Sequence, residues 1–173
     1  SEILTIKQMN FSGIDQIALE SGPLNFILAD LGVSSMQIDN PERGFSFKSE
    51  GPLDLRLDPK RGQSAAARLK TITQDELEGM LIENADEPHA EAIAGAIISQ
   101  IKKGIDISTT AQLQQIIKDA LKSIPGNNKK DEIKKSCQRC FQALRIDVND
   151  EFEVLYEFLE KLPTTLAEGG RVA

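Results

Sequence analysis

Apolar positions recur at helical spacing through most of the chain after residue 64. Stripes repeat every three or four residues, and they predict helices in the segments 65–69, 73–81, 88–103 and 109–121. Thr73-Gln-Asp-Glu76 has the pattern of a capping box, and Pro125-Gly126 ends the last of these segments. Helices with one apolar stripe bury these stripes against one another, so we expect a small helical bundle. Further helices are expected in the later part of 129–142 and in 150–166.

The N-terminal part has a different pattern. Residues 2–9 are rich in strand-forming types, residues 14–19 suit a short helix, and an apolar run at 25–29 follows Gly22-Pro23. This strand–helix–strand order with a short crossover predicts two parallel strands. Because the apolar run ends abruptly at Asp30, it is typical of a strand buried on both faces.

The C-terminal end also has a strand pattern. Ala167-Glu-Gly-Gly170 stops the last helix, and Arg171-Val172-Ala173 has the pattern of a strand that begins. A chain that starts within a sheet and stops where a strand begins is expected to be a fragment of a larger protein. The predicted fold class is therefore α/β, with a helical insertion in an incomplete sheet protein.

Asp30 is the first candidate functional residue. A carboxylate at the carboxyl end of a parallel strand, followed by a Gly/Ser turn, stands where open α/β sheets bind their ligands. The alternative is that Asp30 caps a helix or a turn. The segment from Gly32 to Gly62 that follows is long for a connection and rich in Gly and Pro. Several apolar anchors predict that this segment packs against the protein and is not disordered: Phe45, Phe47, Leu53, Leu55 and Leu57.

Composition limits the class of protein. The chain has 173 residues, 40% of them hydrophobic and 27% charged, which suits one globular domain or one domain with an insertion. No apolar run approaches the roughly 20 residues of a membrane span, and no signal-peptide pattern is present, so we expect a cytoplasmic protein without membrane association. The single C-x-x-C, Cys137 and Cys140, is far in sequence from the only histidine, His89, and lacks the four ligands of a zinc site. We therefore expect no metal, and ordinary thiols in or near a helix.

The net charge of −7 counts against a protein that coats nucleic acid non-specifically. The charge is nevertheless segregated, with basic residues gathered in the segments 43–70 and 129–145 and acidic residues at 75–91. Two interpretations stay open. One is a local basic face for a nucleic acid, and the other is a set of ordinary solvated helix surfaces.

Several motifs resemble those of one enzyme family, and they occur in the same order. They are Asp30-Leu-Gly-Val-Ser-Ser35 with Gln37 and Asp39, Pro41-Glu-Arg-Gly-Phe-Ser-Phe47, Gly51-Pro-Leu-Asp54-x-Arg56-x-Asp58, and Phe141-Gln-Ala-Leu-Arg145-Ile-x-Val-Asn149. From about Phe11 to Gly170 the sequence resembles the RsmH (MraW) family of S-adenosylmethionine-dependent methyltransferases, which modify the N4 of a cytidine in small-subunit (16S) ribosomal RNA. The resemblance implies this activity, the cofactor S-adenosylmethionine, and small-subunit ribosomal RNA or the 30S subunit as partner.

The resemblance also implies an architecture and a site. The architecture is a partial Rossmann-like methyltransferase core, residues 1–38 and 142–173, with an inserted all-α helical domain at 39–141 that binds the substrate. Phe11, Asp30 and Gln37 match the family's cofactor-contacting positions. Asp30 is also the candidate catalytic residue, because methyl transfer to an exocyclic amine needs an in-line approach and a hydrogen-bond acceptor that makes the nitrogen more nucleophilic. Without the family, Phe11 is equally well explained as a core residue at a strand end.

Four arginines are candidates for contacts with RNA phosphates, namely Arg43, Arg56, Arg61 and Arg145. Phe45 or Phe47 could stack on an exposed base. The alternative for Arg56 and Arg145 is a structural role, in which they hold the loop to the core by pairing with Asp54, Asp58 or Asp147.

The roles of some motif residues stay open. Asn149 either lines the pocket or caps the helix that begins near Asp150. Many family members have a basic helix where this chain has Pro88–Gly95, and a Pro-Ala-Thr-Arg pattern where it has Ser136-Cys-Gln-Arg-Cys140. Only Arg139 remains of that pattern, which leaves RNA binding on this side undecided.

The sequence is compatible with three functions. The first is the ribosomal RNA methyltransferase, present as a central portion; the family's Gly-rich turn lies upstream of Ser1, so this fragment is expected to bind S-adenosylmethionine weakly or not at all. The second is a non-catalytic helical module on an α/β remnant that binds RNA or protein. The third is a methyltransferase of this fold that acts on another nucleic acid. The exact nucleotide, the role of the two cysteines and the oligomeric state, a homodimer included, stay undetermined.

Overall fold

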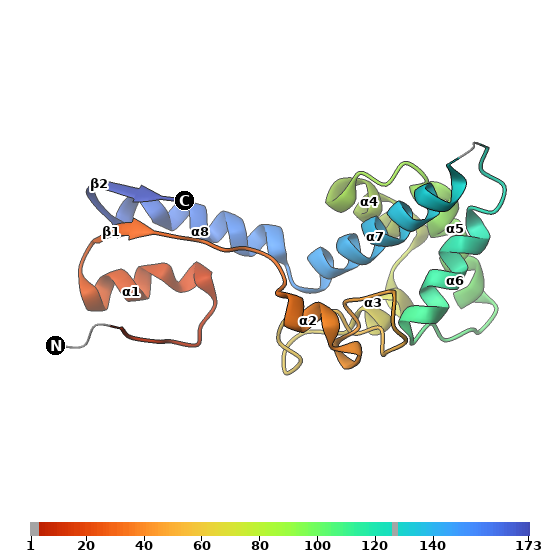
Figure 1. The fold of residues 1–173 in the computed structure, drawn as a ribbon, viewed down its shortest axis with the longest axis horizontal. Coiled ribbons are helices and arrows are strands. Elements are labelled where there is room, and N and C mark those ends of the chain that lie inside the picture. Colours follow the sequence, from red (N-terminus) through yellow and green to blue (C-terminus); the bar gives the residue numbers. More distant parts are fainter. Residues whose placement is uncertain (1–3, 126–127) are drawn as a thin grey trace. The chain divides into compact units, whose positions relative to one another are not determined.

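A computed structural model describes residues 4–125 and 128–173. The chain divides into two compact units, one of residues 1–32 and 150–173 and the other of residues 33–149 (Figure 1). Within the described ranges the protein is mostly helical and has a small parallel sheet of two strands, which is compatible with part of an α/β fold. Residues 2 and 3 of the predicted N-terminal strand, and Gly126 of the predicted helix stop, lie outside the described residues.

The first unit is built on two parallel strands and the helix that packs against them. Its elements are η1 (Phe11–Gly13), α1 (Ile14–Ser21), β1 (Leu24–Ile27), α8 (Glu151–Thr165) and β2 (Leu166–Val172). The strands lie side by side in Figure 1, with Leu24 opposite Leu166 and Ile27 opposite Val172. Ile27 of β1 forms a small buried cluster with Phe158 and Leu162 of α8. This cluster fixes the strand that leads to Asp30.

Two predictions about the strands of this unit are wrong. No strand forms at residues 4–10, where Leu4 and Ile6 are 76% and 86% exposed. A run of strand-forming residues needs a neighbouring strand for its backbone hydrogen bonds, and the parallel partner of β1 is β2 instead. β1 is also not buried on both faces, because Ile27 is buried while Phe26 is 59% exposed.

The C-terminal strand begins earlier than its sequence pattern predicts. It starts at Leu166, so residues 167–170 belong to the strand and do not form a stop before it. The pairing with β1 shifts register between Leu166 and Arg171. Gly169 lies in this stretch with φ = +75°, a left-handed conformation that glycine adopts at little cost. The two glycines therefore form an irregularity inside the strand.

The second unit is helical. Its elements are α2 (Ser35–Asp39), η2 (Pro41–Arg43), α3 (Ala65–Thr71), α4 (Gln74–Ala85), α5 (Ala90–Lys102), α6 (Thr110–Ala120) and α7 (Lys129–Val148). The helices expected from the apolar stripes are confirmed as α3 to α6, whereas α7 is helical from Lys129 onward and therefore longer than expected. Thr73 and Thr109 open α4 and α6 with capping boxes. One core joins α3 to α7, with Leu77, Ile93 and Leu113 fully buried.

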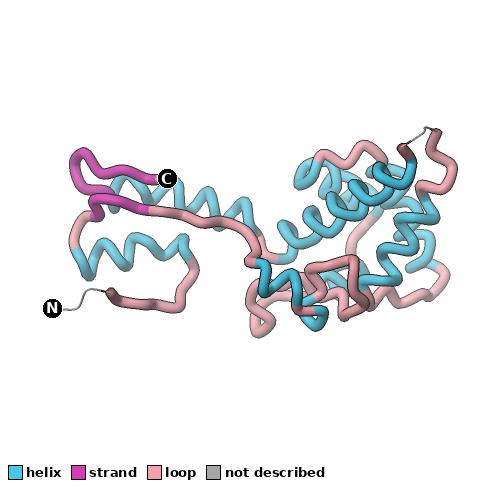
Figure 2. Tube along the Cα trace, viewed as in Figure 1, coloured by secondary structure: helices cyan, strands magenta, loops and turns pink. Residues whose placement is uncertain are grey.

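The segment between α2 and α3 is almost entirely loop in Figure 2, yet it is tightly packed. Leu53 and Leu55 are each 1% exposed and belong to the helical core. The loop is also attached to the start of α6, because Gly51 N donates to Thr110 Oγ1 (3.1 Å) and the Thr110 hydroxyl donates to Ser49 O (2.9 Å). Gly44 has φ = +70°, and a Cβ there would lie 2.1 Å from Pro52 O. The prediction that this segment packs is confirmed, but Leu57 is not one of its anchors, because it is 37% exposed and outside the core.

Candidate functional site

Asp30 lies just beyond the carboxyl end of β1. Ala29 N donates to Ala173 O (2.8 Å) and Ala173 N donates to Ile27 O (3.0 Å), so the parallel pairing continues to the residue before Asp30. The Asp30 side chain is exposed, and among the described residues no hydrogen bond or ion pair occupies its carboxylate. The capping alternative is therefore not realised in the described part of the chain. Asp30 has the position of a ligand-binding carboxylate in an open parallel sheet.

Phe11 packs against the same small core. Its ring meets that of Phe158 edge to face, with centroids 5.4 Å apart and planes at 80°, and Phe11 is 40% exposed. The turn that carries Phe11 is held to α8 by Lys161, whose Nζ donates to Ser12 O (2.7 Å) and pairs with Asp15 Oδ1 (3.2 Å). Phe11 is thus a half-buried ring on a fixed turn. Sequence reasoning missed Lys161, whose only signal is that it is a cation in a helix whose other charged residues are all acidic.

Gln37 belongs to the second unit and has a local structural role. Its Oε1 accepts hydrogen bonds from Ser34 N (2.9 Å) and Ser34 Oγ (3.2 Å), and Gln37 N donates to Ser34 Oγ (3.3 Å). These bonds form a capping box at the start of α2. The box fixes the start of α2, at the end of the Gly/Ser segment that follows Asp30 in sequence. A cofactor contact by Gln37 stays a prediction.

The guanidinium of Arg43 binds backbone carbonyls of the segment between α2 and α3. Its Nη2 donates to Arg56 O (2.9 Å) and Leu57 O (2.8 Å), and its guanidinium lies 5.5 Å from the centre of the Phe45 ring. Phe45 packs against the helical core. The arginine therefore satisfies two backbone acceptors that lie 13 and 14 positions further along the same segment.

Arg56 forms a paired, part-buried contact with Asp54. Arg56 Nε and Nη2 each donate to a carboxylate oxygen at 2.7 Å, and Nη1 donates to Gly62 O at 3.2 Å. The hydrogen bonds from Arg56 lower the pKa of Asp54, partly opposed by burial. The structural alternative for Arg56, pairing with Asp54, is confirmed, and its contact with RNA stays a prediction.

The other two candidate arginines differ from each other. Arg61 is 86% exposed at its side chain and has a loose ion pair with Asp58, with 3.8 Å between Nε and Oδ2. Arg145 is half-buried in the last turn of α7. The carboxylate of Asp147, one of the partners considered for Arg145, accepts a hydrogen bond from Arg68 Nε (3.0 Å). Arg68 thus joins α3 to α7, a role that sequence reasoning did not assign.

Asn149 does not cap α8, and its side-chain amide is fully used in hydrogen bonds to the backbone. Asp150 is the N-cap of α8, and Asn149 ends α7. Its Oδ1 accepts from Leu57 N (2.6 Å), and its Nδ2 donates to Leu55 O (2.8 Å) and Arg145 O (2.7 Å). The capping alternative is wrong, because the amide turns toward the loop.

A buried polar centre lies between α7 and the loop before α5. Glu87 has a fully buried side chain, and its Oε1 accepts from Ser136 Oγ (2.9 Å) and His89 N (3.0 Å). Arg139 Nη1 lies 3.6 Å from Glu87 Oε2.

The two cysteines lie on α7, the helix that also carries Ser136 and Arg139; both are buried, and they form no disulfide. Burial raises the pKa of the Cys137 thiol to about 11 and that of Cys140 well above its usual range. Such thiols are poor nucleophiles, so this centre is structural.

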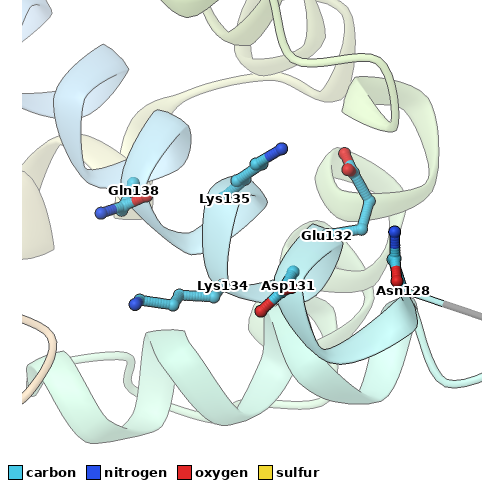
Figure 3. Close-up of a pocket in the computed structure, with 6 residues that line it drawn as sticks. All are labelled: Asn128, Asp131, Glu132, Lys134, Lys135 and Gln138. Carbon is cyan, nitrogen blue, oxygen red and sulfur yellow. The ribbon is translucent and has the colours of Figure 1, made fainter.

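The helical unit has an open hollow of about 300 Å³ along α7 (Figure 3). It is lined by Asn128, Asp131, Glu132, Lys134, Lys135 and Gln138. In Figure 3 Lys134 and Lys135 point to different sides of the helix, and two acidic residues, Asp131 and Glu132, line the same hollow. The hollow therefore lacks convergent groups of one charge.

Within residues 4–125 and 128–173, no group of three or more His, Cys, Asp or Glu side chains could hold a metal ion. No helix in these ranges has the length and apolar character of a membrane span.

Comparison with known proteins decides the family. The sequence matches the model of the MraW methylase family over residues 1–173. The chain belongs to this family. It is 88% identical over 173 residues to the "Ribosomal RNA small subunit methyltransferase H 2" of Alkaliphilus metalliredigens, covering 100% of this chain and 50% of that protein. It is 64% identical over 172 residues to the "Ribosomal RNA small subunit methyltransferase H 1" of Lachnoclostridium phytofermentans, covering 99% and 47%. The chain spans about half the length of the curated relatives it matches.

The candidate residues of this MraW-family chain fall in its two units. Phe11 and Asp30 belong to the first unit: Phe11 packs on Phe158 of the small core, and Asp30 follows the strand that carries Ile27. Gln37 and the candidate arginines belong to the helical unit. Among the arginines, the Arg43 side chain donates a hydrogen bond to the backbone carbonyl of Arg56. Sequence motifs found these residues, and the structure adds which atoms each of them uses within the protein.

Proposed function

We propose that this chain is part of an S-adenosylmethionine-dependent methyltransferase that modifies the exocyclic N4 of a cytidine in small-subunit (16S) ribosomal RNA. The position of Asp30 carries the proposal: an exposed carboxylate directly after a parallel strand, in a chain of the MraW methylase family. The printed names of its relatives, which are ribosomal RNA small subunit methyltransferases, support the substrate class. Activity on ribosomal RNA would also agree with a cytoplasmic location.

The residues of the first unit suit an adenosine-type cofactor. Phe11 offers a ring that is 40% exposed and supported at its edge by Phe158, which fits contact with an adenine. Asp30 offers an acceptor for hydrogen bonds. When bound, S-adenosylmethionine would supply the methyl group. In our proposal Asp30 accepts a hydrogen bond from the exocyclic amine of the cytosine and takes up its proton, which makes the nitrogen more nucleophilic.

We further propose that the helical unit is the insertion that binds the RNA, within a Rossmann-like methyltransferase core to which the first unit belongs. Arg61 supports this, because its side chain is 86% exposed and its ion pair with Asp58 is loose. An exposed, weakly paired arginine is available for a phosphate contact. Arg43 and Arg56 are held by the loop and would act mainly by shaping it.

The test is methylation by the intact protein. Asp30→Ala should abolish the formation of N4-methylcytidine in 30S subunits, measured by mass spectrometry of nucleosides, while the far-UV circular dichroism stays unchanged. Glu168→Ala is the matched control, since Glu168 is also an exposed acid of the first unit, on β2. Substantial methylation by the Asp30 variant would refute the role of Asp30. A different methylated nucleoside would indicate another target, and no methylation by the unaltered protein would favour a non-catalytic binding module.

A further inference from the structure

The loop between α2 and α3 contains a strained residue whose conformation is imposed by its surroundings. Leu55 has φ = +64°, a left-handed conformation that is rare for a bulky residue. Its side chain is 1% exposed and forms part of the helical core. Burial accounts for the position of the Leu55 side chain but not for its left-handed φ. Hydrogen bonds to the backbone must therefore hold this conformation.

Asn149 makes two of those contacts, beside the hydrogen bond from Leu55 N to Arg43 O (3.3 Å). Its amide accepts from Leu57 N at 2.6 Å and donates to Leu55 O at 2.8 Å, so it holds the backbone on both sides of Arg56. The remaining amide hydrogen donates to Arg145 O at 2.7 Å, which anchors the amide to α7. Arg43 holds the opposite carbonyls, Arg56 O and Leu57 O. The side chain of Asn149 is thus devoted to three backbone groups, two of them more than ninety positions away in sequence.

The fixed segment 55–57 carries the part of the loop that projects into solvent, residues 57–62, which we call the loop tip. Every residue of the loop tip is exposed. Its turn is internally ordered, because Arg61 N donates to Asp58 O (3.1 Å) and Lys60 N donates to Asp58 Oδ1 (3.0 Å). Arg56 closes its far end through Gly62 O. The loop tip therefore has a fixed base and displays two cations, Lys60 and Arg61.

We propose that Asn149 is a positioning residue that presents the loop tip to the phosphate backbone of RNA. Lys60 and Arg61 make the contacts, and Asn149 acts through them by fixing the strained Leu55 turn. A preformed loop loses less conformational entropy on binding than a flexible one. This inference rests on the proposed function, because it assumes an RNA substrate.

The test variant is Asn149→Asp in the intact protein. It keeps the acceptor for Leu57 N and places a carboxylate oxygen against the two carbonyl oxygens that now accept hydrogen bonds. We expect faster hydrogen exchange at residues 55–62, a several-fold higher KM for RNA and an unchanged kcat. Asn84→Asp is the matched control, since Asn84 Nδ2 also donates to a carbonyl of α7, Ala143 O, at 3.3 Å, but does not contact the loop. Asn149→Ser replaces the aspartate variant if that variant does not fold.

A third variant separates the inference from the function on which it rests. Arg61→Gln should raise the KM for RNA and reduce the salt dependence of RNA binding by about one unit of log–log slope. If Arg61→Gln has this effect while Asn149→Asp leaves KM or loop exchange unchanged, the positioning role is overturned and the RNA substrate stands. If the unaltered protein neither binds nor methylates ribosomal RNA, the proposed function itself fails.

Discussion

Replacing Arg56 by glutamine should destabilise the helical unit and do so in a pH-dependent way. The substitution removes two short hydrogen bonds to the Asp54 carboxylate, both 2.7 Å, and the bond to Gly62 O. The two side chains are only 20% and 24% exposed, so water replaces these bonds incompletely. Asp54 would then lie part-buried without its cation.

The expected loss in the free energy of unfolding lies between the values for two kinds of charged interaction. Breaking a hydrogen bond to a charged group costs about 1.5–3 kcal/mol, whereas exposed ion pairs contribute about 0–1 kcal/mol. Because the Asp54–Arg56 pair lies between these cases, we expect a loss of about 2 kcal/mol in the free energy of unfolding at neutral pH. The matched control is Arg61→Gln. Its exposed ion pair, 3.8 Å long, predicts a change within about 0.5 kcal/mol.

The pH dependence gives the sharper test. The pKa of Asp54 is lowered in the folded protein, chiefly by the side-chain hydrogen bonds from Arg56. The stabilisation from the pair is therefore fully present above the unfolded pKa of about 3.9, and it is lost as the pH falls through the lowered folded value. Urea unfolding followed by circular dichroism, at neutral pH and at about pH 3, should show the difference between the two proteins shrinking in acid. A loss of equal size at both pH values would refute the ion-pair explanation.

Two further predictions concern buried positions. Gly44→Ala should cost more than about 1–2 kcal/mol, because φ is +70° and the new Cβ would lie 2.1 Å from Pro52 O; Gly79→Ala, in the interior of α4 with open space around it, should instead gain about 0.5–1 kcal/mol. Calorimetric melting of both variants checks this, and equal shifts of Tm would contradict it. Burial raises the pKa of Cys137 to about 11 and that of Cys140 well above its usual range, so neither thiol should react with a disulfide reagent at pH 8 until urea unfolds the chain. Rapid labelling of the folded protein would show that the thiols are accessible.

The sequence by itself determined what depends on neighbouring residues and on motif order. Helix α4 was predictable because its capping box and apolar stripe lie within one short segment, and α6 was predictable from its apolar stripe. The family could likewise be inferred from the ordered motifs, and the match over the whole chain confirms it. Asp30 was singled out by its place after an apolar run, which is again a local pattern.

Only the tertiary structure decided which distant groups meet. The strand pattern at residues 2–9 suggested a partner for β1, yet the partner is β2, at the other end of the chain. Likewise Asn149 looked like a helix cap, and its amide instead binds the backbone at Leu55 and Leu57. A side chain or strand edge bonds to whichever acceptor the fold brings within reach, and that choice is not encoded in its own neighbourhood. The arginines differ for the same reason: the Arg56 guanidinium bonds to the part-buried Asp54 carboxylate, while that of Arg61 stays in solvent.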